Sequence, residues 1–129
     1  MNEATMEEIP FPTDARGLVF EPLDGARLGQ QQNVHVALTL PGAIRGNHFH
    51  QHSTEIAVVL GPGLVRLREG RTAREVPIPE GRAFRFTLPP GVSHAFKATG
   101  PTPMLIVAFS TAVFDAMNPD RTEDMLFTS

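Results

Sequence analysis

The sequence predicts an all-β fold in a single domain, and three observations lead to this expectation. The chain has 129 residues, which is the length of one ordinary domain. Its 11 glycines and 12 prolines are spread along the chain and leave no room for long helices. The segments between these breaks are short and rich in β-branched residues or phenylalanine, as strands are. Many short strands separated by turn signals indicate a sandwich or a barrel.

The N-terminal residues 1–13 are predicted to form a flexible arm, because this stretch is acidic and ends in Ile-Pro-Phe-Pro. The alternative is a strand that becomes ordered only against another subunit. The folded domain is expected to span residues 14–129.

An alternation of apolar and polar side chains marks residues 33–40 as a strand. One face would carry only valines and leucines, and the other would carry His35, Ala37 and Thr39. Further strands are expected at residues 55–60, 64–69, 83–88 and 104–109. One short helix is expected at residues 111–117, ended by the Asn-Pro pair that follows.

The composition excludes several classes of function. The formal net charge of -3, with no run of basic residues, gives no footprint for a nucleic acid polymer. The absence of cysteine excludes disulfides and thiolate ligands. No signal peptide and no apolar stretch of about 20 residues is seen, so we expect a cytoplasmic protein without a membrane span.

Four of the five histidines and one glutamate fall into two clusters, which are the most informative feature of the sequence. His48 and His50 are two residues apart, so on an extended strand they point the same way. The four residues after His50 can turn the chain so that Glu55 opens the next antiparallel strand beside them. In the second cluster, a Pro-Pro-Gly turn delivers His94 onto a strand whose inner face also includes Phe96.

Three imidazoles and one carboxylate inside a dry barrel suit a divalent transition metal. We expect one such ion, Zn²⁺ first and Fe²⁺, Mn²⁺ or Ni²⁺ as alternatives, whereas Ca²⁺ and Mg²⁺ prefer oxygen ligands. The competing interpretation is an accidental group of surface histidines. It does not explain why the last histidine follows a Pro-x-Gly turn.

The two clusters resemble the paired signatures of the cupin superfamily, G-x5-H-x-H-x3-4-E-x6-G and G-x5-P-x-G-x2-H-x3-N. The sequence departs from them at Gly46, which lies closer to His48 than the pattern has it, and at Ala98, which replaces the final asparagine. The resemblance implies a single-domain cupin, which is a double-stranded β-helix or jelly-roll barrel. The metal ligands it implies are His48, His50, Glu55 and His94.

A narrower resemblance runs from Asp14 to about Leu126. It includes D-x-R-G-x-x-x-E, the Gly29-Gln30 pair, P-G-x-x-R-G-N-H-x-H-x4-E, P-P-G-x-x-H and F-D-x-x-N-P-D. These motifs resemble the metal-binding cupin domain at the C-terminus of bifunctional capsular-polysaccharide sugar-nucleotide epimerase/reductase enzymes. The R-G-N-H stretch is also similar to the R-G-L-H of dTDP-4-keto-6-deoxyglucose 3,5-epimerases. The resemblance implies a metal-dependent isomerase or epimerase of a keto-sugar nucleotide or a similar carbonyl compound.

Such a reaction needs a base that removes the proton next to the carbonyl. We assign this role first to His35 and second to His52, since neither is among the four ligands. A satisfied structural role for His35 and an exposed turn for His52 are the alternatives. The 3,5-epimerases also use a tyrosine as acid, and this chain has none.

Four further residues are candidates for binding a small-molecule substrate such as a nucleotide sugar. The guanidinium fork of Arg45 suits a phosphate or a sugar carboxylate, and the resemblance places an arginine at the substrate there. Gln30 belongs to the Gly-Gln pair of the resemblance. Arg66 either lines the pocket or faces solvent, and Phe96 is either pocket wall or plain core.

Two other functions use the same residues. One is an Fe²⁺-dependent cupin dioxygenase, and the other is a cupin that binds a small molecule without turnover. We also predict a homodimer, because the acidic arm and the apolar face of residues 34–40 offer a strand edge and a hydrophobic surface.

Overall fold

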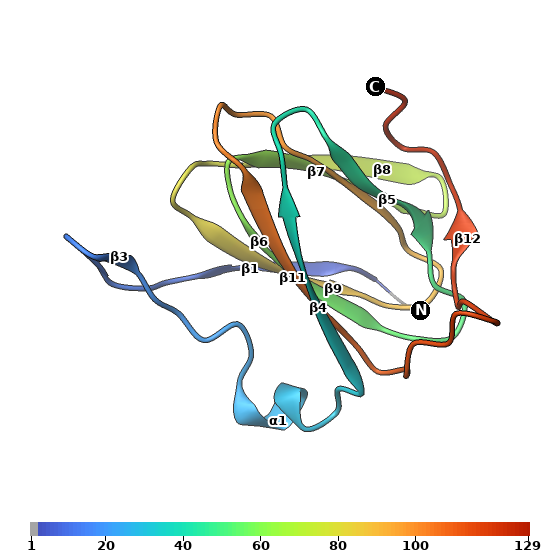
Figure 1. The fold of residues 1–129 in the computed structure, drawn as a ribbon. Helices are drawn as coiled ribbons and strands as arrows, with labels where there is room; N and C mark the ends of the chain where they lie inside the picture. Colours follow the sequence, from blue (N-terminus) through green and yellow to red (C-terminus); the bar gives the residue numbers. More distant parts are fainter. Residues whose placement is uncertain (1–2) are drawn as a thin grey trace.

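The computed structural model describes residues 3–129 and confirms the all-β prediction, with two antiparallel five-stranded sheets (Figure 1). The first sheet contains, in spatial order, β1 (Thr5–Ile9), β9 (Ala83–Leu88), β6 (Glu55–Leu60), β11 (Met104–Ser110) and β4 (Asn33–Thr39). The second contains β12 (Thr122–Glu123), β5 (Ile44–Phe49), β10 (Ser93–Lys97), β7 (Gly63–Glu69) and β8 (Thr72–Ile78).

Three small elements complete the described chain. The strands β2 (Thr13–Asp14) and β3 (Gly17–Leu18) form a two-stranded hairpin. The helix α1 (Gly25–Leu28) is a single turn, which Asp24 begins by accepting a hydrogen bond from the backbone N–H of Arg27. Within the described chain, no helix is long and apolar enough to cross a membrane.

Alternation along the strands places apolar side chains between the two sheets. On β7, Val65 and Leu67 are fully buried, whereas Arg66 between them lies on the outer face. Val65 lies opposite Phe96 of β10, and this interior also takes in Phe86 of β9. The barrel interior is therefore a packed core next to the pocket described below.

The outer face of the first sheet is covered by the N-terminal segment over only part of its width. Leu23 is buried there in a cluster with Ile56 and Val58 of β6. The strand β4 lies at the edge of the sheet. The outward side chains of this strand and of the residue that follows it are 55–65% exposed: Val34, Val36, Leu38 and Leu40. The alternation expected for residues 33–40 is thus confirmed, with its apolar face turned outward.

The N-terminal segment differs from the flexible arm that the sequence predicted, because part of it pairs with a strand of the same chain. Residues Thr5–Ile9 form β1, which pairs over its whole length with β9 of the same chain. Glu7 forms an ion pair with Arg85 on that strand, and Glu8 forms one with Arg82, which directly precedes it. The acidic character that favoured a solvated arm serves instead to match the arginines of its neighbour.

The helix expected at residues 111–117 is wrong, because this segment consists of bends, a turn and irregular chain. A helix of this length is marginal unless it buries an apolar face. Here Val113, Phe114 and Met117 are all 64–86% exposed. The carboxylate of Asp115 accepts a hydrogen bond from the backbone N–H of Met117, which favours a turn.

Candidate metal centre

A β-bulge between β5 and β10 lies next to the pair formed by His48 and His94. His94 pairs with His48, but the next residue, Ala95, pairs with Gly46, so Asn47 is the extra residue. Both Gly46 and Asn47 have positive φ, at 85° and 61°. A Cβ atom at Gly46 would lie 2.7 Å from the carbonyl oxygen of His94. Glycine is therefore needed where β5 passes closest to His94.

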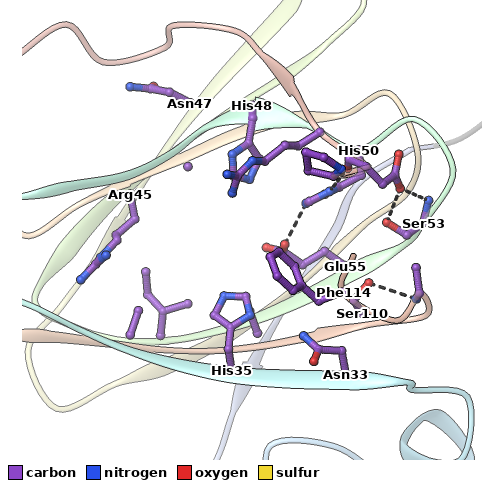
Figure 2. Close-up of a pocket in the computed structure, with 18 of the residues that line it drawn as sticks. Asn33, His35, Arg45, Asn47, His48, His50, Ser53, Glu55, Ser110 and Phe114 are labelled. Carbon is purple, nitrogen blue, oxygen red and sulfur yellow. Dashed lines mark hydrogen bonds and ion pairs between the residues drawn. The ribbon is translucent and has the colours of Figure 1, made fainter. Parts of the chain in front are cut away.

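Glu55 reaches the histidines from the opposite sheet. The sequence predicted that Glu55 opens a strand beside His48 and His50, but β6 pairs with β9 and β11 rather than with β5. The residues between His50 and Glu55 carry the chain across the barrel from the second sheet to the first. The carboxylate thus approaches the imidazoles across the interior (Figure 2).

The side chains of His48, His50, Glu55 and His94 converge as the sequence predicted. One nitrogen or oxygen atom of each lies within 4.8 Å of those of the others. Nε2 of His50 is 3.0 Å from Oε1 of Glu55, and Nε2 of His94 is 3.5 Å from Oε2 of the same carboxylate. His94 is fully buried, and Glu55 is 7% exposed.

The hydrogen bonding of His94 shows that this set of donors fits a metal ion. Its Nδ1–H donates to the carbonyl oxygen of Val92 at 3.1 Å, which leaves Nε2 as an acceptor directed at the cluster. Nε2 is buried and has no hydrogen-bond partner among the described residues. An unpartnered buried nitrogen is costly in a folded protein, and a bound cation would satisfy it.

The electrostatics of the cluster favour the protonation states that metal ligands require. Burial, with the neighbouring His94 and His50, lowers the pKa of His48 to about 4, and burial also lowers the pKa of His94. Burial alone would raise the pKa of Glu55, but the nearby imidazoles lower it. Burial would lower the pKa of His50, whereas its contacts with Glu55 raise it. At neutral pH the cluster thus offers an ionised carboxylate and two neutral imidazoles.

An open pocket of about 1040 Å³ lies over the cluster between the two sheets. Figure 2 shows His48 and Arg45 entering it from one side and His35 from the other. His35 comes from β4 of the first sheet, beside Asn33. The pocket therefore joins the candidate metal centre to a histidine that is not one of its four members.

The structure brings some of the other predicted site residues to the pocket and leaves others outside. His35, Arg45 and Phe96 line it. Gln30 is exposed at the end of α1, and Arg66 lies on the outer face of β7, paired with Glu75. His52 is exposed in the turn before Glu55. Those three residues are not among the pocket's lining residues.

The C-terminal segment contributes pocket residues to which sequence reasoning gave no role. Phe114, Asn118, Asp120 and Arg121 line the pocket. The first three belong to the F-D-x-x-N-P-D stretch and Arg121 directly follows it, so the motif was the available signal. Their place near the histidines depends on the pairing of β12 with β5, which sequence spacing does not reveal.

Comparison with known proteins gives a family match over most of the chain. A family model described as polysaccharide biosynthesis C-terminal domain matches residues 12–122. The chain is also 29% identical over 116 residues to UDP-2-acetamido-2,6-beta-L-arabino-hexul-4-ose reductase of Pseudomonas aeruginosa. That match covers 88% of this chain but 30% of the reductase, so the chain spans less than a third of its curated relative.

Solved structures show the same fold. The capsular polysaccharide assembling protein CapF from Staphylococcus aureus matches with a TM-score of 0.66 and 26% identity, over 73% of this chain and 26% of that one. ChmJ, a 3'-monoepimerase from Streptomyces bikiniensis solved with dTDP-quinovose, matches with a TM-score of 0.74 and 22% identity, over 93% of this chain and 68% of that one. The expected single-domain cupin fold is confirmed.

Proposed function

The chain belongs to the polysaccharide biosynthesis C-terminal domain family, and from this premise we propose that it is a metal-dependent isomerase or epimerase of a keto-sugar nucleotide or a similar carbonyl compound. The relatives support a sugar-nucleotide-modifying function in general. The observation that carries the finer proposal is the cluster of three histidines and Glu55 below a pocket that holds a further histidine, His35.

We infer that the cluster holds one divalent transition metal, with Zn²⁺ first and Fe²⁺, Mn²⁺ or Ni²⁺ as alternatives. Three nitrogen donors and one carboxylate suit these ions, and the unpartnered Nε2 of His94 supports an occupant. When bound there, the ion would act as a Lewis acid that stabilises negative charge on a substrate oxygen.

The proton transfer falls to His35 in this proposal. Its imidazole would take the proton from the carbon next to the carbonyl, so that a C–H bond breaks, an N–H bond forms and the electron pair moves toward the carbonyl oxygen. Its place on the sheet opposite His48 supports this role, because the substrate would lie between the two. His52 lies outside the pocket, so we assign the base to His35 alone.

Binding of the charged end of the substrate is assigned to Arg45 and Arg121. Both side chains are exposed and line the pocket, where a guanidinium fork can hold phosphate oxygens. The buried side chain of Phe96 supplies an apolar part of the pocket lining. The pocket volume of about 1040 Å³ is sufficient for a substrate of this size.

We also propose that the protein forms a homodimer through β4. This strand is one of the two edges of its sheet, and its outward valines and leucine are exposed in the structure of residues 3–129. A second copy would cover both the edge and the apolar face. The cytoplasmic location expected from the sequence stays a prediction.

Hydrogen exchange tests the proposed reaction. In D₂O, a 4-keto nucleotide sugar incubated with the metal-loaded protein should gain deuterium at the carbon next to the carbonyl, as read by mass spectrometry. A chelator should abolish the exchange. His35→Gln should lower the exchange rate by about 100-fold or more, the usual contribution of a positioned base. His52→Gln is the matched control and should exchange at the wild-type rate.

Two results would count against the proposal. Absence of exchange with several such sugars, together with O₂ consumption on another substrate, would favour the dioxygenase. Equal exchange rates in His35→Gln and the wild type would remove His35 as the base.

A further inference from the structure

The C-terminal residues 120–127, which we call the C-terminal strap, run alongside β5, the strand that carries His48. Within the strap, β12 lies beside β5 (Figure 1). In this pairing Glu123 lies opposite His48. The backbone N–H of Asp124 donates to the carbonyl oxygen of Asn47 at 2.8 Å. The side-chain Oδ1 of Asn47 accepts hydrogen bonds from the backbone N–H groups of Leu126 and Phe127.

Asp120 begins the strap and holds the turn that follows His50. Its Oδ1 accepts hydrogen bonds from the backbone N–H groups of Gln51 and His52, at 2.9 and 3.1 Å. Its Oδ2 accepts from the backbone N–H and the hydroxyl of Ser53, at 2.9 and 2.7 Å. One carboxylate thus binds three successive amides of the turn that joins His50 to Glu55.

The main chain of the same residue contacts a metal-ligand candidate directly. Nδ1–H of His50 donates to the carbonyl oxygen of Asp120 at 2.6 Å. This bond fixes the ring so that the other nitrogen, Nε2, faces Glu55 at 3.0 Å. Metal-bound histidines commonly use such a bond to set which nitrogen remains free for the metal.

The surroundings of Asp120 indicate a local role rather than a role in charge pairing. The side chain is half-buried, and no ion pair links it to a lysine or arginine in residues 3–129. Its partners are instead backbone amides and one hydroxyl, all in the turn between two ligand candidates. Its position 67–70 residues away in the chain means that the strap ties distant parts of the sequence together at the cluster.

We propose that Asp120 is a positioning residue that fixes the geometry of His50 and Glu55 for metal binding. This inference rests on the proposed metal centre and adds the residue that preorganises it. The carboxylate sets the path of the turn, and the carbonyl sets the ring of His50. Without the carboxylate, the turn after His50 loses its acceptor. The main chain of residue 120 then also loses its attachment to that turn, so its carbonyl group no longer fixes the ring of His50.

Competition with a chromophoric zinc chelator measures the effect on metal affinity. Asp120→Ala should weaken the zinc Kd by about 10- to 100-fold, the usual cost of losing a residue that orients a ligand. Asp120→Asn retains one acceptor oxygen and should be intermediate, and Ser53→Ala should lose a few-fold. The Co²⁺-loaded Asp120→Ala protein should also show altered visible absorption bands, which a purely structural role would leave unchanged.

Asp24→Ala is the matched control, because Asp24 likewise caps a turn through a backbone amide but lies outside the pocket. Its thermal stability should fall while its zinc Kd and Co²⁺ spectrum stay at wild-type values. Wild-type affinity and spectrum in Asp120→Ala would overturn the role of Asp120 and leave the metal centre standing. If Asp120→Ala does not fold, wild-type affinity in both Asp120→Asn and Ser53→Ala would overturn it. A wild-type protein that binds no zinc would overturn both proposals.

Discussion

At the scale of single residues, the cluster depends on the close approach of two backbones at Gly46. The positive φ of 85° is shared by Gly42, where φ is 86°. The two positions differ in their surroundings, because a Cβ atom at Gly42 would meet nothing within 4 Å. A Cβ atom at Gly46 would instead lie against the carbonyl oxygen of His94. A side chain at Gly42 would therefore cause backbone strain alone, whereas a side chain at Gly46 would cause the same strain and a steric conflict.

Substitution by alanine at each position tests whether the steric conflict at Gly46 adds to the backbone strain. Gly42→Ala should cost about 1–2 kcal/mol of unfolding free energy, the strain of a side chain at positive φ. Gly46→Ala should cost at least about 2 kcal/mol more, since β5 and β10 must move apart. Urea unfolding of the metal-free proteins measures both. Equal losses would show that the strands at the bulge tolerate a methyl group.

The four residues of the metal-ligand cluster could be predicted because each lies in a short local sequence pattern. The spacing of His48 and His50 needs only the two-residue period of a strand, and His94 follows a turn that the sequence shows. The motif that contains Asp120 was visible, but the role of this residue could not be predicted, because its partners lie 67–70 residues away. Arg66 was ambiguous because the face it occupies depends on which side of β7 meets the core.

At the scale of elements, β1 is the clearest departure from the sequence prediction. Its last residue, Ile9, is 6% exposed and belongs to the apolar cluster that contains Leu23 and Ile56 on the outer face of the first sheet. Met6, on the same strand, is 43% exposed. Strand pairing with β9 was not predictable, because acidic residues and prolines resemble a solvated arm until the arginines of the partner strand are in place.

Truncation of these two side chains tests the docking of β1. Ile9→Ala should cost about 2–4 kcal/mol through loss of buried surface and the cavity left behind. Met6→Ala should cost less than about 1 kcal/mol, as exposed positions usually do. Thermal or urea unfolding gives both values. If both substitutions are neutral, the segment behaves in solution as the flexible arm that its composition indicated.

The barrel itself could be predicted, but the route of the chain between its sheets could not. Turn signals and strand patterns give the character and the approximate positions of many of the short strands, but they did not predict β1 or β8. They do not show that the turn before Glu55 crosses to the opposite sheet, since a hairpin and a crossover of this length have similar residues. The segment 111–117 was assigned as a helix because sequence reasoning could not see that it lacks a face to bury.

At the scale of the whole molecule, the uncovered edge of β4 predicts the oligomeric state. Multi-angle light scattering at micromolar concentration should give twice the chain mass of 14.1 kDa. Val36→Lys, at a position 65% exposed on β4, should give the monomer mass, because a charge would be buried at the interface. Val19→Lys, at a 71% exposed position away from β4, should remain a dimer. A monomeric wild-type protein would reject the proposal.

The metal content of the purified protein is the most direct test of the proposed metal centre. Elemental analysis of wild-type protein prepared without added metal should find close to one equivalent of a transition metal, and His50→Ala should lose most of it. The double variant His48→Ala/His94→Ala should contain essentially none, because two of the three imidazoles that converge with Glu55 are gone. A full equivalent retained by the double variant would contradict the assignment, since the ion would then be held elsewhere.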